Sequence, residues 1–220
     1  LELNKFDEAI GLIDKGISII PNKVDLYRSK TAILMYFNEY SKLLDLLDEM
    51  LEKFPKIEKD LLMKKASVYK LLGNLDAGFK IVRELLEKNP EDKELLSFIA
   101  YWYQYLNKKD NALNAIEALI KSEQDKGEYY DSYGEILMNY EEYEEAVEQF
   151  QKAIKLSGSG WFIYQTYIKL GICFKELENY ELAVEYLKKG KELTNKCICD
   201  HDLKKKWLAI ADIFLTEIER

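Results

Sequence analysis

A helix–turn–helix pattern that recurs along the chain is the feature that most constrains its fold. Residues 127–156 hold the clearest copy, which consists of two amphipathic segments joined by the short link 139–142. Gly134 in the first segment and Ala146 in the second are small where two helix backbones must come close, and Phe150 fills the space beside them. Such a unit predicts two antiparallel helices that share one apolar face.

Three columns of residues repeat in phase at intervals of 34 to 40 residues. The column of small residues in the first helices comprises Thr31, Ala66, Ala100, Gly134, Gly171 and Ala211. Each of these residues has a large apolar residue three positions later and an aromatic residue or leucine four positions earlier. Chance rarely keeps three columns in phase over six copies, so we expect an array of repeats.

The order aromatic, large, small, large in the first helix, followed by Ala, aromatic, Ala in the second, resembles the tetratricopeptide repeat (TPR). The resemblance implies an all-α fold, a right-handed superhelix or solenoid of TPR helix–turn–helix repeats with about 12 helices. Because each repeat buries its apolar stripe only against its neighbours, we expect a single TPR domain over residues 1–220. The expected units are a half repeat 1–21, full repeats at about 24–58, 59–92, 93–126, 127–160 and 164–197, and a closing helix at about 203–219.

Composition narrows the class of protein further. The chain is 48% apolar and 33% charged, which excludes a disordered or a membrane-embedded chain. Its apolar runs, such as residues 98–103, are far shorter than a bilayer span, and it shows no charged-then-apolar leader. Three cysteines make no disulfide framework, so we expect a reducing, cytoplasmic environment. The net charge of −8 argues against a nucleic-acid partner.

Catalytic, cofactor and metal motifs are weak or missing. The chain has no G-x-x-x-x-G-K, G-x-G-x-x-G or H-E-x-x-H sequence, so we expect neither an enzyme nor a bound cofactor. Cys197, Cys199 and His201 are weak candidates for metal ligands, because zinc sites usually need a second, well-separated ligand pair. A link between repeats, with Asp202 as the N-cap of the last helix, fits this cluster better. Cys173 falls in an apolar column and is expected in the core.

The first helices of TPR repeats line a concave groove, and the resemblance carries this property to the present chain. The residues expected to line a ligand-binding groove are Arg28, Met35, Met63, Lys64, Lys70, Tyr101, Gln104, Tyr105, Glu128, Asp131, Glu135 and Asn139. Tyr101 and Tyr105 are four residues apart and therefore share one helical face. The carboxylates of Glu128, Asp131 and Glu135 predict a ligand that carries Lys or Arg next to an apolar anchor.

We therefore expect a non-catalytic protein–protein interaction scaffold that binds a peptide or protein segment in the concave groove, with neither nucleic acid nor membrane as a partner. One alternative is a module that self-associates through its N-terminal end, where Phe6, Ile10, Ile13 and Ile17 lack a partner helix on one side. A second alternative is the recruitment region of a larger multidomain protein.

Overall fold

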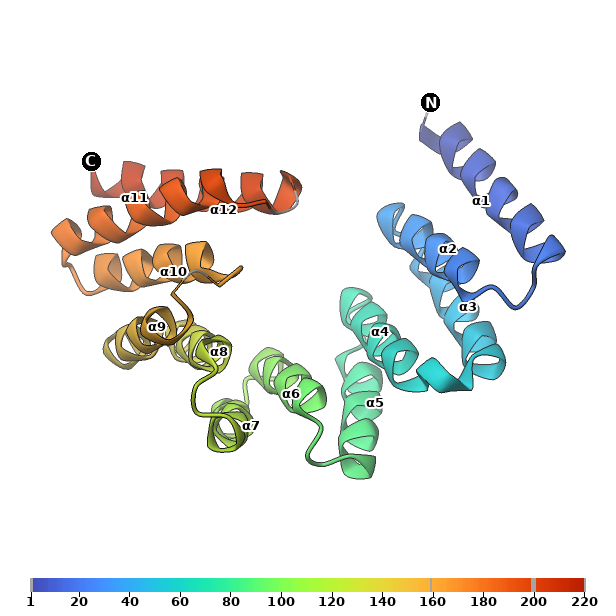
Figure 1. The fold of residues 1–220 in the computed structure, drawn as a ribbon, viewed down its shortest axis with the longest axis horizontal. Coiled ribbons are helices and arrows are strands. Elements are labelled where there is room, and N and C mark those ends of the chain that lie inside the picture. Colours follow the sequence, from blue (N-terminus) through green and yellow to red (C-terminus); the bar gives the residue numbers. More distant parts are fainter. Residues whose placement is uncertain (1, 159, 199–200, 220) are drawn as a thin grey trace. The chain divides into compact units, whose positions relative to one another are not determined.

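The computed structural model describes residues 2–158, 160–198 and 201–219, with side chains from residue 5 onward. This part of the chain contains twelve α-helices, one short 3₁₀ helix and no strand, so the predicted all-α fold is confirmed (Figure 1). The elements are α1 (Glu2–Ile19), α2 (Val24–Tyr36), α3 (Tyr40–Lys53), η1 (Pro55–Ile57), α4 (Glu58–Leu71), α5 (Leu75–Lys88), α6 (Lys93–Tyr105), α7 (Lys109–Ser122), α8 (Gly127–Asn139), α9 (Tyr143–Ser157), α10 (Ile163–Glu176), α11 (Tyr180–Lys196) and α12 (His201–Ile218).

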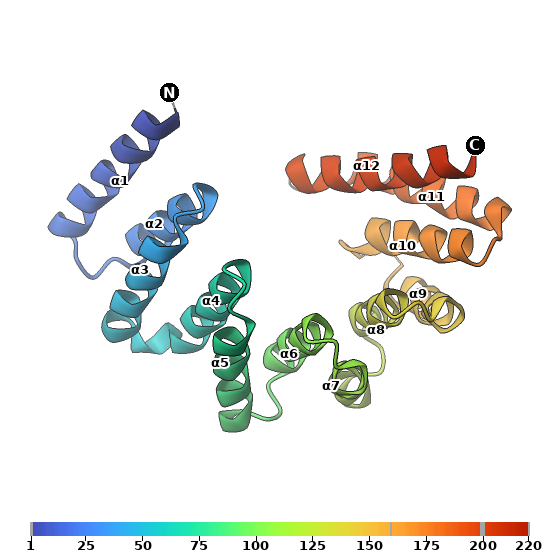
Figure 2. The same cartoon turned by 180° about the vertical axis from the view of Figure 1, so that it is seen from behind.

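The helices are grouped in two compact units, Leu1–Leu95 and Leu96–Arg220. In the first unit, each helix from α1 to α5 packs against the next one in the chain. In the second unit, α7 to α12 pack in the same consecutive way, and α8 and α12 also contact α10 (Figure 2). The organisation of the whole chain as a single domain stays a prediction. No helix in the described ranges is both long enough and apolar enough to cross a bilayer.

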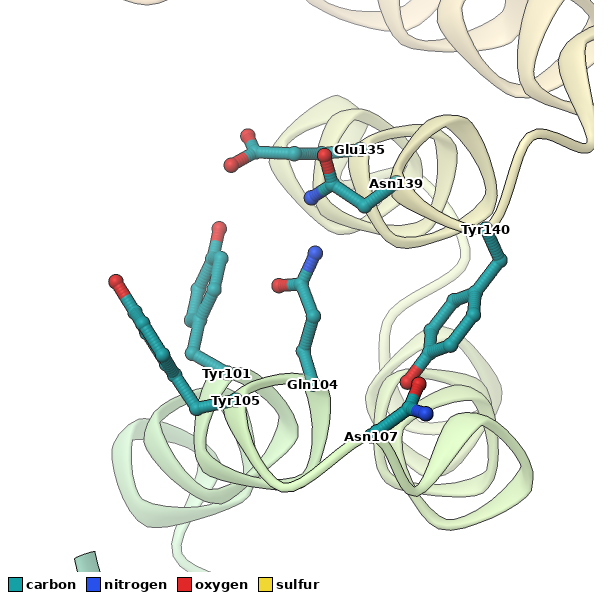
Figure 3. Close-up of a pocket in the computed structure, with 7 residues that line it drawn as sticks. All are labelled: Tyr101, Gln104, Tyr105, Asn107, Glu135, Asn139 and Tyr140. Carbon is teal, nitrogen blue, oxygen red and sulfur yellow. The ribbon is translucent and has the colours of Figure 1, made fainter.

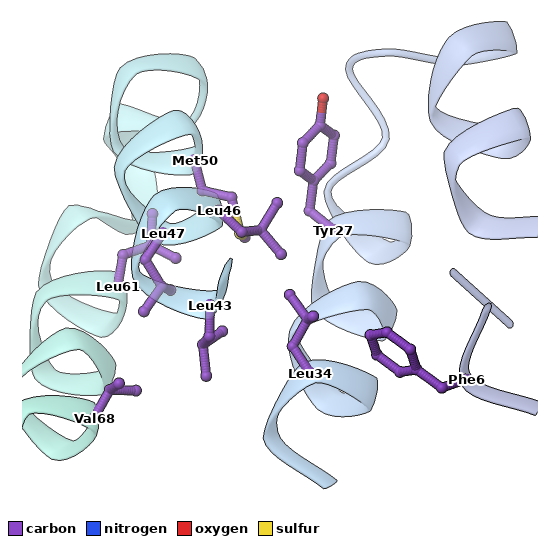
Figure 4. Packing of buried hydrophobic residues seen from close by; sticks show 9 residues of the cluster. All are labelled: Phe6, Tyr27, Leu34, Leu43, Leu46, Leu47, Met50, Leu61 and Val68. Atoms are coloured by element: carbon purple, nitrogen blue, oxygen red, sulfur yellow. The ribbon is translucent and has the colours of Figure 1, made fainter. Parts of the chain in front are cut away.

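The first unit is held together by a continuous apolar cluster (Figure 4). Tyr27 and Leu34 of α2 face Leu46 and Met50 of α3, and Phe6 of α1 closes the cluster beside Leu34. Each of these side chains has at most 9% of its surface exposed. Burial of a side chain of this size stabilises the fold by about 1.5–3 kcal/mol relative to leaving it exposed.

All six residues of the small-residue column are buried, as the repeat pattern predicted. The space beside the two glycines is especially tight. A Cβ atom at Gly134 would lie 2.8 Å from the ring of Phe150, and one at Gly171 would lie 2.7 Å from Cγ of Leu187 and 2.9 Å from its backbone nitrogen. The two helices of a repeat therefore approach each other at these positions more closely than any side chain would allow.

Consecutive helices are joined by two kinds of chain reversal, one between repeats and one within a repeat. Helices α1, α3 and α5 each end two residues before Pro21, Pro55 or Pro90, because the residue before a proline is kept out of the helical conformation. Inside the full repeats, the turn between the two helices contains a residue with positive φ, seven positions after the small residue. These residues are Asn38 (58°), Gly73 (74°), Asn107 (54°), Glu141 (62°) and Glu178 (58°).

The N-terminal helix presents a different face to solvent from the one predicted. Phe6 is buried, and Ile10 and Ile17 pack against the cluster formed by α2 and α3, so these side chains have partners within the first unit. Among the described side chains of α1, from residue 5 onward, the exposed large apolar ones are Leu12, at 70% of its surface, and Ile19, at 77%. The half repeat lacks the first helix against which its second helix would pack. The periodicity of α1 therefore identified its apolar residues but not the side of α1 that α2 covers.

The close approach at Gly171 can be tested against a matched glycine. Gly171→Ala should destabilise the protein, because overpacking typically costs about 1–3 kcal/mol. Gly11→Ala is the control, since a Cβ at Gly11 in α1 would meet no atom within 4 Å. That change should leave stability unchanged or raise it by up to about 1 kcal/mol through helix propensity. Urea unfolding followed by circular dichroism measures both variants, and equal effects would contradict the assigned register.

Candidate functional site

A pocket of about 350 Å³ lies on the second unit where α6 faces α8 (Figure 3). Tyr101, Gln104 and Tyr105 project from α6 toward Glu135 and Asn139 on α8. Asn107 and Tyr140, from the turns that follow these two helices, complete the wall. The pocket thus combines aromatic rings, amides and one carboxylate, which are groups that bind side chains and backbone of a peptide.

The two tyrosines of α6 differ in their environment. The Tyr101 hydroxyl lies 3.3 Å from the hydroxyl of Ser132 on α8, which holds the ring against the pocket wall. Burial raises the pKa of Tyr101 above its ordinary value, and the neighbouring charge of Glu135 raises it further. Tyr105 is 57% exposed and therefore presents its ring to solvent at the mouth of the pocket.

Behind the pocket, a buried cluster of charged groups joins α8 to α10. The ammonium group of Lys169 donates hydrogen bonds to Asp131, at 2.9 Å, and to Oε2 of Glu135. The Thr166 hydroxyl donates to the second oxygen of Asp131 at 2.7 Å. The exposed fractions of the side chains are 5% for Lys169, 11% for Asp131 and 29% for Glu135. The cluster is therefore closed at Asp131 and open toward the pocket at Glu135.

The charge balance keeps Lys169 protonated. Burial alone lowers the pKa of Lys169, but the charges of Asp131 and Glu135 and the hydrogen bonds to them outweigh this effect and raise the pKa above its ordinary value. One ammonium group faces two carboxylates, so the cluster carries a net negative charge on the side of the pocket.

Five of the predicted groove residues come together in this pocket: Tyr101, Gln104, Tyr105, Glu135 and Asn139. Asp131 lies instead in the buried cluster, where its carboxylate is engaged by Lys169 and Thr166. Glu128 is exposed and accepts a hydrogen bond from Nε1 of Trp161 at 3.3 Å.

The other five predicted residues belong to the first unit. Arg28 and Lys64 are exposed, and Arg28 forms an ion pair with Asp25 at 3.5 Å. The remaining three side chains are half-buried, and they are Met35, Met63 and Lys70.

Sequence reasoning missed three residues of the site. Asn107 and Tyr140 lie in turns, where helical periodicity gives no information. Lys169 was overlooked although it left a signal, because it is the only cation in the apolar stretch 161–174. A lone lysine on a buried helix needs a carboxylate partner, and Asp131 and Glu135 on the preceding repeat provide it.

The cysteines offer little chemistry. Cys173 is buried, as predicted, and burial raises the pKa of its thiol to about 12, so the thiol stays protonated and unreactive near neutral pH. Cys197 is half-buried at the end of α11 and His201 is exposed at the start of α12, whereas Cys199 lies outside the described residues. Within the described residues, no three His, Cys, Asp or Glu side chains are grouped as metal ligands would be.

The elements described above define a helical repeat protein with a pocket between two of its first helices, α6 and α8. Residues 127–159 and 164–197 match the family model described as "Tetratricopeptide repeat", and a comparison with curated protein sequences finds no match. These two stretches are tetratricopeptide repeats, so the resemblance to the TPR family drawn from the residue columns is confirmed over them.

Solved structures of other proteins share this fold. MamA (residues 41 to the end) from Desulfovibrio magneticus RS-1 is 18% identical, with a TM-score of 0.58 over 80% of this chain and 97% of that one. BtubC (BKLC) from P. vanneervenii is 14% identical, with a TM-score of 0.66 over 88% of this chain and 89% of that one. YrrB is 19% identical, with a TM-score of 0.51 over 88% of this chain and 96% of that one. At these identities, the similarity concerns the fold.

The buried cluster makes a prediction about stability. Lys169→Met should destabilise the protein by about 3–5 kcal/mol, because it leaves the charge of Asp131 buried without a counter-ion. Combining it with Asp131→Asn removes that charge and should restore much of the loss. Denaturant unfolding of the single and double variants gives the two free energies.

Lys191→Met is the control for this comparison, since it removes a more exposed ion pair with Asp212 in the same unit. It should cost at most about 1 kcal/mol. A Lys169→Met variant as stable as the Lys191→Met variant would show that the cluster does not hold α8 and α10 together.

Proposed function

We propose that this protein is a non-catalytic scaffold that binds a peptide or protein segment in the pocket between α6 and α8. The observation that carries the proposal is the convergence of Tyr101, Tyr105 and Gln104 on Glu135 and Asn139 around one cavity. The ligand places an apolar side chain and a basic side chain in this pocket, with the basic group toward Glu135.

The chemistry of the wall supports this kind of ligand. An exposed aromatic ring gives a large contact area with little loss of conformational entropy, which is why tyrosine is frequent at binding hot spots. Tyr105 is such a ring, and Tyr101 is already held in place by Ser132. The amides of Gln104 and Asn139 can each donate to and accept from a peptide backbone. The negative charge at Glu135 favours cationic ligands over acidic ones.

One protein with the same fold gives the proposal a precedent. YrrB is described as a TPR protein with an unusual peptide-binding site. The proposal for the present chain holds equally if the chain acts alone or as the recruitment region of a larger multidomain protein, because the pocket is formed within the second unit.

The pocket is tested by comparing two exposed tyrosines. Peptides are first selected on the wild-type protein from a random display library, and their affinities for the variants are then measured by fluorescence polarisation. Tyr105→Ala should weaken binding by about 1–2 kcal/mol, roughly five- to thirtyfold, because it removes the ring at the mouth of the pocket.

Tyr36→Ala is the matched control, since Tyr36 ends α2 as Tyr105 ends α6 and is 77% exposed, but it does not line the pocket. It should leave the affinity unchanged. Selected peptides that bind all three proteins equally would remove the pocket from the mechanism.

A second candidate function is self-association through the N-terminal helix. Leu12 and Ile19 are exposed and lie seven residues apart, so they share one face of α1. An apolar stripe in water is stabilised when a second copy covers it. We propose this contact as an assembly surface that is separate from the pocket.

Sedimentation velocity over a range of concentrations tests the assembly surface. The wild-type chain should sediment faster as its concentration rises, whereas the double variant Leu12→Glu/Ile19→Glu should stay monomeric, because two charges cannot be buried in such a contact. Leu71→Glu, at a side chain that is 52% exposed in α4, is the control and should behave like the wild type. A wild-type chain that is monomeric at the highest concentration would exclude this function.

A further inference from the structure

The buried cluster behind the pocket holds one positive charge for two negative charges. Each oxygen of Asp131 accepts a hydrogen bond, one from Thr166 and the other from Lys169, and the residue is almost fully enclosed. Lys169 is enclosed to the same degree. The two carboxylates share the uncompensated charge, and Glu135 is the only member of the cluster that also lines the pocket, so a ligand can reach that charge there.

Glu135 is fixed at one oxygen and open at the other. Its Oε2 accepts the hydrogen bond from Lys169, and its Oε1 accepts none from the described residues. In Figure 3, the carboxylate of Glu135 extends over the hydroxyl end of Tyr101, on the side of the pocket where Tyr105 also lies. A group bound there would meet a carboxylate oxygen and two aromatic rings at once.

We infer that Lys169 is a positioning residue for ligand recognition: it holds Glu135 so that Oε1 faces the pocket, and the ligand supplies the missing positive charge as the guanidinium group of an arginine side chain. This inference rests on the proposed function, because it assumes that the pocket binds a peptide. The inference adds two statements to the proposed function: the pocket selects arginine in the ligand, and Lys169 makes this selection possible by holding Glu135.

The surroundings of Glu135 favour a guanidinium group over an ammonium group. A guanidinium group is planar and stacks on aromatic faces, which the rings of Tyr101 and Tyr105 provide. It also carries five N–H donors. Gln104 and Asn139 line the pocket from α6 and α8, and their side-chain oxygens can accept the hydrogen bonds that Glu135 does not. An ammonium group holds its hydration more strongly and has no flat face.

The test uses two small probes that differ in charge but hardly in shape. They are N-acetyl-leucyl-arginine amide and its citrulline counterpart, in which a neutral urea replaces the guanidinium group. Binding to the full chain is followed by NMR through the ring signals of Tyr101 and Tyr105. The arginine probe should bind at least about tenfold more tightly than the citrulline probe, as expected for a charge-assisted hydrogen bond.

Three variants separate charge from position. Glu135→Gln removes the charge and should abolish the preference for arginine. The double variant Asp131→Asn/Lys169→Met keeps the net charge of the cluster but frees Glu135, and it should lose most of the preference. Glu135→Asp also keeps the charge but shortens the side chain, so one carboxylate can no longer reach both Lys169 and the pocket. It should lose the preference as well, and it tests the positioning role if the double variant does not fold.

The outcomes are distinct. A double variant or a Glu135→Asp variant that discriminates as well as the wild type would show that charge alone acts and would overturn the role of Lys169. Equal binding of both probes to the wild type would overturn the choice of a cation, while leaving the pocket as a peptide site. A third probe, N-acetyl-leucyl-lysine amide, compares the two cationic groups, and binding equal to that of the arginine probe would overturn the preference for guanidinium. If neither probe shifts the tyrosine signals, the inference fails, and the comparison of Tyr105 with Tyr36 decides separately whether the pocket binds peptides.

Discussion

The close contact of helix backbones at the small-residue column is the constraint on which the binding surface depends. At Gly134 there is no room for a methyl group between the two helices of the repeat, so the rotation of α8 about its own axis is fixed. Residues one and five positions after the small residue then face away from the contact. In α6 these are Tyr101 and Tyr105, and in α8 they are Glu135 and Asn139. The pocket is therefore a consequence of packing on the opposite side of the same helices.

The polar counterpart of this packing is the cluster around Lys169. Taking an ammonium group out of water is costly, and it is compensated only when Asp131 and Glu135 of α8 lie opposite α10. A shift of one helix along the other would separate the charges, whereas apolar side chains would tolerate it more easily. The cluster therefore specifies how the fourth and fifth repeats fit together, and through Glu135 it extends this order to the pocket.

The sequence predicted the orientation of residues whose place in a helix is fixed by the repeat pattern. It missed residues in turns and residues whose partners lie in another repeat. Tyr101 and Tyr105 could be assigned to one face because six copies define the rotation of a first helix. The partners of Lys169 could not be read from its own repeat, since Asp131 lies 38 residues away and only the packing of two repeats brings them together. Turn residues such as Tyr140 follow no helical period. The outward face of Leu12 was missed because the half repeat offers no first helix to fix the rotation of α1.

The turn inside each full repeat, with its one residue of positive φ, has a consequence for how such a chain can evolve. The residue in this conformation is glycine at position 73, asparagine at positions 38 and 107, and glutamate at positions 141 and 178. Glycine adopts it freely and asparagine tolerates it, whereas glutamate pays about 1–2 kcal/mol for it. Because each of these turns lies between the two helices of one repeat, duplication or deletion of a repeat carries the turn with it and leaves the neighbouring turns intact. The array can gain or lose whole units by simple genetic events, while its pockets are altered only where the two flanking repeats change.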